Sequence, residues 1–240
     1  PATGSLRTNG DITFNRLKLK WRHVLFSPIR VFVFHQVSEQ FDEKSMWACD
    51  WTEINQFKEH IRLLQNEYTF ISLHEAYFHL QNDWSCTNKF AVLTADDGWG
   101  SILNVLPWLC EQQIPITLFL NPRYLDGIHK QERETEKLLS QNDIRSILES
   151  YPNVSIASHG WNHKSCKEMS DEEFEENVIR SNDALSSFKR FIPFYAFTFG
   201  KYNDSQLEIL QKHQLIPVLV DGMKNHKGTK VIHRECIDGK

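Results

Sequence analysis

The sequence predicts an α/β protein in which helices cover a parallel β-sheet. Short runs rich in β-branched and aromatic residues alternate with longer segments of helical periodicity along most of the chain. Such alternation is typical of parallel strands joined by crossover helices. Polar side chains directly follow several of the expected strands, at the sheet edge where both barrels and open sheets bind ligands. The pattern therefore leaves a closed barrel and an open sheet as alternatives.

The elements follow one another in a regular order. The segments expected to form strands are residues 31–34, 68–72, 89–94, 116–120, 153–157, 194–198, 216–220 and 230–233. The segments expected to form helices are residues 52–65, 74–82, 100–113, 131–150, 170–189 and 204–213. Phe57, Ile61 and Leu64 repeat at helical spacing in the first helix, for which Asp50 or Thr52 is the expected N-cap. Ser170 and Glu173 have the spacing of a capping box.

Composition indicates a soluble globular protein of one or two domains. Hydrophobic residues make up 40% and charged residues 24% of the 240 residues. The formal net charge of −4 gives no sign of a nucleic-acid partner. The cysteines are odd in number and contain no CxxC pair, which favours a reducing compartment and argues against a disulfide framework or a thiolate zinc site. They are Cys49, Cys86, Cys110, Cys166 and Cys236.

The N-terminal residues differ from the rest of the chain. We expect residues 1–29 to form an extension ahead of the main domain, which spans residues 30–240. Within the extension, residues 16–26 are basic and amphipathic, which favours a helix packed on the domain and leaves peripheral membrane contact as the alternative. No apolar run is long enough to cross a membrane, and no signal-peptide layout is present. A cytoplasmic location, with membrane association as a variant, is therefore expected.

Two motifs suggest a metal site. Asp96 and Asp97 follow an expected strand, and like charges in one site raise each other's pKa unless a cation or a proton lies between them. His159 and His163 follow another strand and can converge on one ion. One carboxylate and two imidazoles would then bind a metal, and the other carboxylate would remain as a base. The structural alternative is an Asp-Gly turn with a surface histidine pair.

These motifs resemble those of the polysaccharide deacetylases, the NodB-homology or carbohydrate esterase 4 group. Residues 94–98 are similar to the family's TFDDG motif, and residues 158–163 are similar to its SH-x3-H motif. Residues 34–37 resemble the "YH-x-V" segment of the subgroup that acts on bacterial surface glycans. The resemblance covers about residues 30–238. It implies an α/β fold, a distorted (β/α) barrel of about seven strands, and a bacterial source.

The resemblance also implies roles for individual residues. Asp97, His159 and His163 match the metal ligands, and Asp96 matches the catalytic base. A donor set of one carboxylate and two imidazoles without a thiolate suits Zn²⁺, and also Fe²⁺, Co²⁺ or Ni²⁺.

Other matches to the family are looser. The arginine of the family's RPPYG segment is missing from residues 196–200, and Arg234 is the expected replacement beside the base. His233 and His35 are alternatives for the acid that protonates the leaving amine. The residues expected to contact substrate are Trp99, Trp161, Asn121, Arg123 and Tyr195.

The expected function is that of a metal-dependent hydrolase. It would remove N-acetyl groups from an N-acetylated sugar or a surface polysaccharide precursor, with Asp96 as the base and a metal-activated water as the nucleophile. Two other functions stay open. One is a carbohydrate-binding protein that has lost catalysis, and the other is an amide hydrolase with a non-sugar substrate. The sequence does not indicate the oligomeric state.

Overall fold

The computed structural model describes residues 28–39, 51–82, 88–125 and 138–238. The extension expected over residues 1–29 lies outside the described residues except at its end, and the amphipathic segment 16–26 lies wholly outside. Part of the helix expected over residues 131–150 also falls there. Within the described parts of the chain, no helix combines the length and the apolar character needed to cross a membrane.

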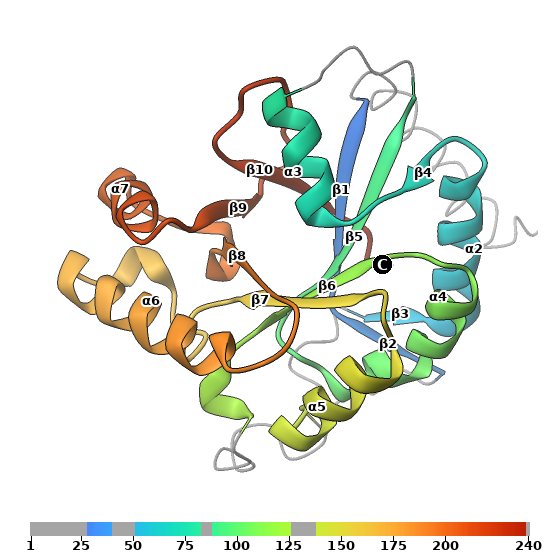
Figure 1. The fold of residues 1–240 in the computed structure, drawn as a ribbon, viewed down its shortest axis with the longest axis horizontal. Coiled ribbons are helices and arrows are strands. Elements are labelled where there is room, and N and C mark those ends of the chain that lie inside the picture. The colour runs from blue at the N-terminus through green and yellow to red at the C-terminus, as the bar shows by residue number, and fades with distance from the viewer. Residues whose placement is uncertain (1–27, 40–50, 83–87, 126–137, 239–240) are drawn as a thin grey trace, which may run out of the picture.

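Seven parallel strands form a closed barrel (Figure 1). The order β1-β10-β9-β8-β7-β6-β5 returns to β1, because β1 pairs with both β10 and β5. This confirms the barrel of about seven strands. The barrel strands are β1 (Ile29–Phe34), β5 (Phe90–Ala95), β6 (Ile116–Leu120), β7 (Val154–Ser158), β8 (Phe191–Ala196), β9 (Ile216–Val220) and β10 (Ile232–Cys236).

The barrel is irregular in two places. The register between β7 and β8 shifts between Ile156 and Ser158. A short strand, β4 (Thr69–Phe70), pairs with the start of β5, while β6 pairs with β5 only from Leu93 onward. A separate parallel pair, β2 (Gln36–Ser38) and β3 (Trp51–Glu53), was not expected from the sequence.

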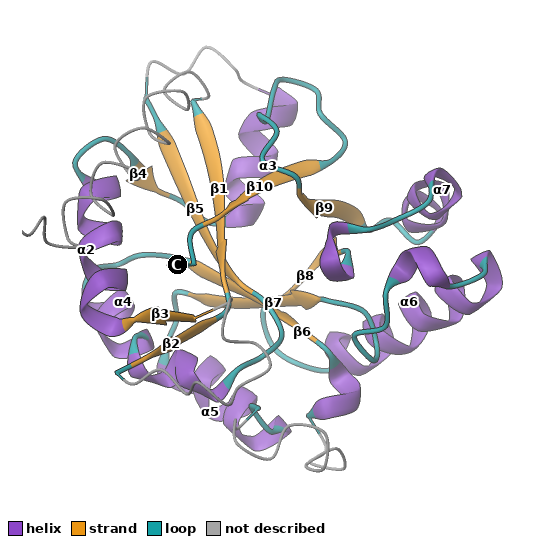
Figure 2. Cartoon of the chain, turned by 180° about the vertical axis from the view of Figure 1, so that it is seen from behind, coloured by secondary structure: helices purple, strands orange, loops and turns teal. Residues whose placement is uncertain are grey.

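Helices cover the outside of the barrel. Figures 1 and 2 show α2 and α4 together on one side and α6 and α7 on the opposite side. The helices are α2 (Ile54–Gln65), α3 (Leu73–Asn82), α4 (Leu106–Glu111), α5 (Gln141–Ser150), α6 (Asp171–Ser186) and α7 (Asp204–Lys212). Short 3₁₀ helices are η2 (Gly100–Asn104), η3 (Pro122–Tyr124), η4 (Cys166–Glu168) and η5 (Thr198–Gly200).

Strand alternation divides the core into an interior and an exterior. The barrel interior is apolar, and α3 packs against it through Leu73, Ala76 and Leu80. The strand residues of this interior cluster include Val92, Phe119, Ala157, Ala196, Val218 and Ile232. Outward-facing residues pack under α2, α4 and α5 in one cluster and under α6 and α7 in another. This apolar cluster lies beneath the polar side chains at the strand ends.

Several expected boundaries need correction. The N-cap of α2 is Glu53, whose side chain accepts a hydrogen bond from Gln56 N, and not Asp50 or Thr52. The helix expected over residues 100–113 is divided into η2 and α4 at Val105, ahead of the proline in the first turn of α4. The capping box of Ser170 and Glu173 at the start of α6 is confirmed.

Candidate active site

Polar side chains from several strands meet at the carboxyl end of the barrel. Asp96 and Asp97 directly follow β5, His159 directly follows β7, and His35 directly follows β1. Arg234 lies within β10. Parallel strands end at the same edge of a barrel, so residues far apart in the sequence become neighbours there.

Asp96 and Arg234 form a buried, bidentate ion pair. Arg234 Nη1 donates to Asp96 Oδ1 and Arg234 Nη2 donates to Asp96 Oδ2, both at 2.7 Å. Arg234 is 0% exposed and Asp96 is 3% exposed. Arg234 Nη1 also donates to Thr94 Oγ1 at 3.0 Å, and the guanidinium lies 5.0 Å from the centre of the Phe119 ring. The fork geometry fixes the carboxylate in one orientation.

The ion pair also sets the charge of Asp96. Burial raises the pKa of its carboxyl group, but the positive charges of Arg234 and His159 and the hydrogen bonds from Arg234 outweigh burial and lower that pKa. Asp96 is therefore an ionised carboxylate at neutral pH. The sequence expectation that Arg234 lies beside Asp96 agrees with this contact.

Asp97, His159 and His163 converge at a second point of the site. Asp97 Oδ1 lies 2.9 Å from His163 Nε2 and 3.4 Å from His159 Nε2. One possible donor atom from each of the three residues lies within 4.8 Å of the other two. Burial raises the pKa of Asp97, but the two imidazoles outweigh burial and hold it well below its ordinary value. A negative centre faces two imidazoles, as in a cation site.

These three residues fit a divalent metal. Asp97 Oδ1 is buried, yet no described residue donates a well-formed hydrogen bond to it, so an acceptor lone pair is left over. His159 Nδ1 lies 2.9 Å from the carbonyl oxygen of Ala196, which can only accept a hydrogen bond, so Nδ1–H donates there and Nε2 is the ring nitrogen that faces Asp97. Trp99 Nε1 donates to Asp97 Oδ2 at 3.2 Å. Such outer contacts orient ligands in metal sites.

The backbone holds the ligands in unusual conformations. Asp97 has φ 71° and His163 has φ 54°, both in the left-handed region. Such residues cost free energy and are concentrated at functional sites. Gly160 has φ 76°, and a Cβ atom there would lie 2.8 Å from Tyr195 Oη and 2.9 Å from Asn177 Oδ1. Only glycine fits this position of the ligand loop.

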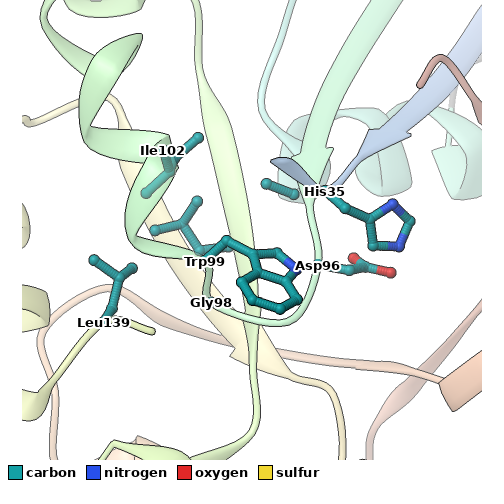
Figure 3. A pocket seen from close by; sticks show the side chains of 8 residues that line it. His35, Asp96, Gly98, Trp99, Ile102 and Leu139 are labelled. Carbon is teal, nitrogen blue, oxygen red and sulfur yellow. The ribbon is translucent and has the colours of Figure 1, made fainter. Parts of the chain in front are cut away.

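His35 lies beside Asp96 in a small pocket (Figure 3). His35 Nδ1 lies 2.6 Å from Asp238 Oδ2, and the backbone N–H of His35 donates to Asp238 Oδ1 at 3.0 Å. Burial lowers the pKa of His35, but hydrogen bonds with Asp238 and Cys236 and the charge of Asp238 outweigh burial and raise it well above its ordinary value. His35 is thus a protonated imidazole that lies next to the ionised carboxylate of Asp96.

His233, the other candidate acid, faces a different environment. Neighbouring residues of a strand point to opposite faces, and Arg234 points into the barrel toward Asp96. His233 Nδ1 lies 2.8 Å from Asp221 Oδ2, in the loop after β9. The backbone of His233 pairs with the side chain of Asn225. Of the two histidines, His35 lies with the other site residues.

The residues expected to contact substrate differ in exposure. Trp99, Asn121 and Tyr195 are buried, at 2%, 2% and 0% exposed. Asn121 Nδ2 donates to the carbonyl oxygens of His159 and Gly160, so it supports the ligand loop. Tyr195 Oη donates to Asn177 Oδ1 at 3.3 Å. These side chains support the residues around Asp97 and His159 and are themselves almost inaccessible to a bound molecule.

Trp161 and Arg123 are more accessible. Trp161 is partly exposed, and the Arg180 guanidinium lies 4.6 Å from its ring centre. Arg123 is exposed, and its backbone N–H donates to the Trp161 carbonyl oxygen at 3.1 Å. Phe199, which lies in the segment matched to RPPYG but was not among the expected substrate contacts, is 52% exposed, and its ring centre lies 4.8 Å from that of His163. These three residues leave exposed surface beside the candidate metal-binding residues.

No sequence motif indicates three residues that support the site. Asp238 and Cys236 lie beside His35, and Asn177 of α6 accepts a hydrogen bond from Trp161 N at 2.9 Å. Asp238 and Cys236 come after the last expected strand, where no motif indicated a site. The spacing of Asn177, on the buried face of α6, marks only a helix.

Comparison with known families identifies the class of protein. The family model described as "Polysaccharide deacetylase" matches residues 85–218, so the chain belongs to the polysaccharide deacetylase family. The match includes Asp96, Asp97, His159 and His163. Comparison with curated proteins gave no match.

Solved structures share the fold. A de-N-acetylase from Aggregatibacter actinomycetemcomitans is 19% identical with a TM-score of 0.73, and the alignment covers 88% of this chain and 95% of that one. The deacetylase PplD from Streptococcus pyogenes, in complex with acetate, is 19% identical with a TM-score of 0.71, covering 87% and 92%. IcaB from Ammonifex degensii is 16% identical with a TM-score of 0.71, covering 88% and 92%.

Proposed function

We propose that this chain is a metal-dependent hydrolase that removes N-acetyl groups from an N-acetylated sugar of a surface glycan or its precursor. The observation that carries the proposal is the pairing of two unlike carboxylates. The negative charge of Asp96 is balanced by the guanidinium of Arg234, whereas the neighbouring Asp97 faces His159 and His163. The first suits a base, and the second suits a metal ligand.

Asp97, His159 and His163 would hold the metal, for which Zn²⁺ is the first candidate. When bound, such an ion lowers the pKa of a water molecule and polarises the acetyl carbonyl group. Trp99 and the Ala196 carbonyl group keep Asp97 and His159 oriented toward one point. The loop that carries His159 and His163 would set the position of the scissile amide.

Asp96 would act as the base. Its carboxylate takes a proton from the attacking water while the water oxygen bonds to the acetyl carbon. Each oxygen of Asp96 keeps a lone pair beyond the one used by Arg234. Arg234 prevents rotation of the carboxylate and keeps it charged before the reaction.

His35 would act as the acid. Cleavage of the C–N bond leaves an amine that needs a proton, and the protonated imidazole of His35 faces the same pocket as Asp96. Asp238 holds the ring through Nδ1, so Nε2–H is the proton available to the leaving nitrogen. The products are acetate and a free amino sugar.

The missing arginine of residues 196–200 favours the alternative of a binding protein without catalysis. Arg234 supplies a guanidinium to Asp96 from β10, which removes that support. An amide hydrolase with a non-sugar substrate would use the same residues, so only a substrate test separates it from the deacetylase.

The test is acetate release from a panel of N-acetylated oligosaccharides and non-sugar amides by the metal-loaded protein. We expect release from acetylated sugars, reduced about 100- to 10,000-fold in Asp96→Asn. The matched control, Asp183→Asn on the exposed face of α6, should leave the rate unchanged. Equal release by the wild-type protein and Asp96→Asn contradicts the proposed base, and cleavage of non-sugar amides alone contradicts the proposed substrate.

A further inference from the structure

A second group of possible metal ligands lies at the mouth of the barrel. It consists of His35, Cys236 and Asp238, and is separate from Asp97, His159 and His163. His35 follows the end of β1, and Cys236 is the last residue of β10. Because β1 and β10 are paired with Val33 opposite Cys236, the ends of these two strands lie side by side. The topology therefore brings a thiol, an imidazole and a carboxylate together.

The three side chains already converge on one atom. Asp238 Oδ2 lies 2.6 Å from His35 Nδ1 and 3.2 Å from Cys236 Sγ. The other oxygen of Asp238 accepts the backbone N–H of His35 at 3.0 Å, and the Asp238 side chain is only 2% exposed. The carboxylate is thus anchored from behind, as ligands are in metal sites. Cys236 is exposed, so solvent can reach this group.

The spacing of these atoms is close to that of a tetrahedral site. Ligand bonds of about 2.0 Å for nitrogen or oxygen and about 2.3 Å for sulfur imply ligand separations of about 3.3–3.6 Å. The Sγ–Oδ2 separation of 3.2 Å is near this range. The Nδ1–Oδ2 separation of 2.6 Å must lengthen by about 0.7 Å when the bridging proton leaves. A small rotation of the His35 side chain, which is 19% exposed and so less enclosed than Asp238, would achieve this.

We propose that His35, Cys236 and Asp238 form a second transition-metal site, with a preference for Zn²⁺ and similar thiophilic ions. Its thiolate distinguishes it chemically from the site of Asp97, which has only nitrogen and oxygen donors. Binding releases the thiol proton of Cys236 and the Nδ1 proton of His35 to solvent, and the ring keeps its Nε2 proton. Three protein ligands leave a fourth position for water.

Occupancy of this site would switch off the acid, a consequence that rests on the proposed function. A metal-bound neutral imidazole is a far weaker acid than a free imidazolium, so His35 could no longer protonate the leaving amine. Excess Zn²⁺ should therefore lower the deacetylation rate by about 100- to 10,000-fold, the usual contribution of a general acid. The inhibition should require Cys236.

The experiment is a titration of the metal-free full-length protein with Co²⁺ at mildly alkaline pH, followed by absorption. A thiolate ligand gives an intense near-ultraviolet charge-transfer band, which nitrogen and oxygen donors do not give. We expect two equivalents to bind to the wild-type protein, with the band growing as the second is taken up. Cys236→Ser should bind one equivalent without the band, and the matched control Cys110→Ser should behave as the wild-type protein does.

Asp97→Ala separates this proposal from the proposed function. It should lose the equivalent without the band and keep the equivalent with the band. Absence of the band from the wild-type protein, or its persistence in Cys236→Ser, would overturn the second site whatever the state of the first. If the equivalent without the band still binds to Asp97→Ala while the band is intact, only the proposed active site is contradicted.

Discussion

Both terminal nitrogens of Arg234 donate to Asp96, one to each carboxylate oxygen, at 2.7 Å inside the barrel. The two residues are 138 positions apart and come from β10 and the end of β5. A buried ion pair contributes little net stability, because desolvation of both charges offsets their attraction. Its value here is that Asp96 stays ionised and oriented next to Asp97, where a lone buried carboxylate would take up a proton.

Replacement of Arg234 by lysine should impair catalysis more than it impairs folding. A single ammonium group cannot donate to both oxygens of Asp96 in the fork geometry. We expect the kcat/KM for deacetylation to fall about 10- to 100-fold in Arg234→Lys, the equivalent of one hydrogen bond to a charged group. Steady-state kinetics would check this, with Arg145→Lys on the exposed face of α5 as control. An unchanged kcat/KM would mean that catalysis does not need the two parallel hydrogen bonds from Arg234 to Asp96.

Removal of the guanidinium should destabilise the fold through the charge left behind. Arg234→Met leaves Asp96 buried without a partner, which costs about 3–5 kcal/mol in the free energy of unfolding. The double variant Asp96→Asn/Arg234→Met should recover part of that loss, because the neutral amide needs no counter-charge. Urea unfolding of the wild-type protein, the single variants Asp96→Asn and Arg234→Met, and the double variant measures the coupling between the two side chains. Additive losses would show that the two side chains are not coupled.

Gly160→Ala should weaken metal binding. The new Cβ atom would lie 2.8 Å from Tyr195 Oη and 2.9 Å from Asn177 Oδ1, so the loop that carries His159 and His163 must shift. We expect about a 10- to 100-fold loss of metal affinity, as for other disturbances around the ligands. Gly222→Ala is the matched control, since its φ of 68° imposes similar strain with no atom within 4 Å. Equal effects in both variants would attribute the loss to backbone strain alone.

The pH dependence of catalysis should report on Asp238. If protonated His35 is the acid, kcat/KM falls as pH rises through its pKa, and Asp238 places that pKa well above the ordinary value for histidine. Asp238→Asn removes the charge, so the alkaline limb should move to lower pH. An alkaline limb that stays in place would point to another acid, such as His233.

The same shift links His35 to stability. A group with a raised pKa contributes stability below its unfolded-state pKa, and that contribution is lost as pH rises through its folded-state pKa. The stability advantage of the wild-type protein over Asp238→Asn should therefore narrow with rising pH. Thermal unfolding of both proteins, measured from below the unfolded-state pKa of histidine to above the folded-state pKa of His35, would check this narrowing.

The regular parts of the fold could be predicted because their signals are local. The strands β6 and β9 begin and end where their apolar runs do, and Ser170 marks the start of α6 with its own side chain. The pair β2 and β3 has three residues in each strand, too few for a periodic signal. Closure of the barrel by β1 and β5 depends on long-range pairing that periodicity does not record.

The candidate site also has a part that the sequence predicts and a part that depends on long-range contacts. Asp96, Asp97, His159 and His163 lie in motifs whose spacing alone suggests shared chemistry. The choice between His35 and His233 depends on which face of the barrel each side chain reaches, and that requires the strand register. The carboxylate of Asp238 could not be assigned to His35, because the two residues are 203 positions apart and no motif connects them.

The most direct test of the proposed active site is the tightly bound metal content of protein purified without a metal-affinity step. It is best measured in the Cys236→Ser background, which removes the thiol of the proposed second site. We predict near-stoichiometric transition metal in this protein and in its Asp96→Asn derivative, and its loss in the Asp97→Ala and His159→Ala derivatives. Metal that remains in both of the last two, or none in the parent protein, would contradict a catalytic centre built on Asp97 and the two histidines.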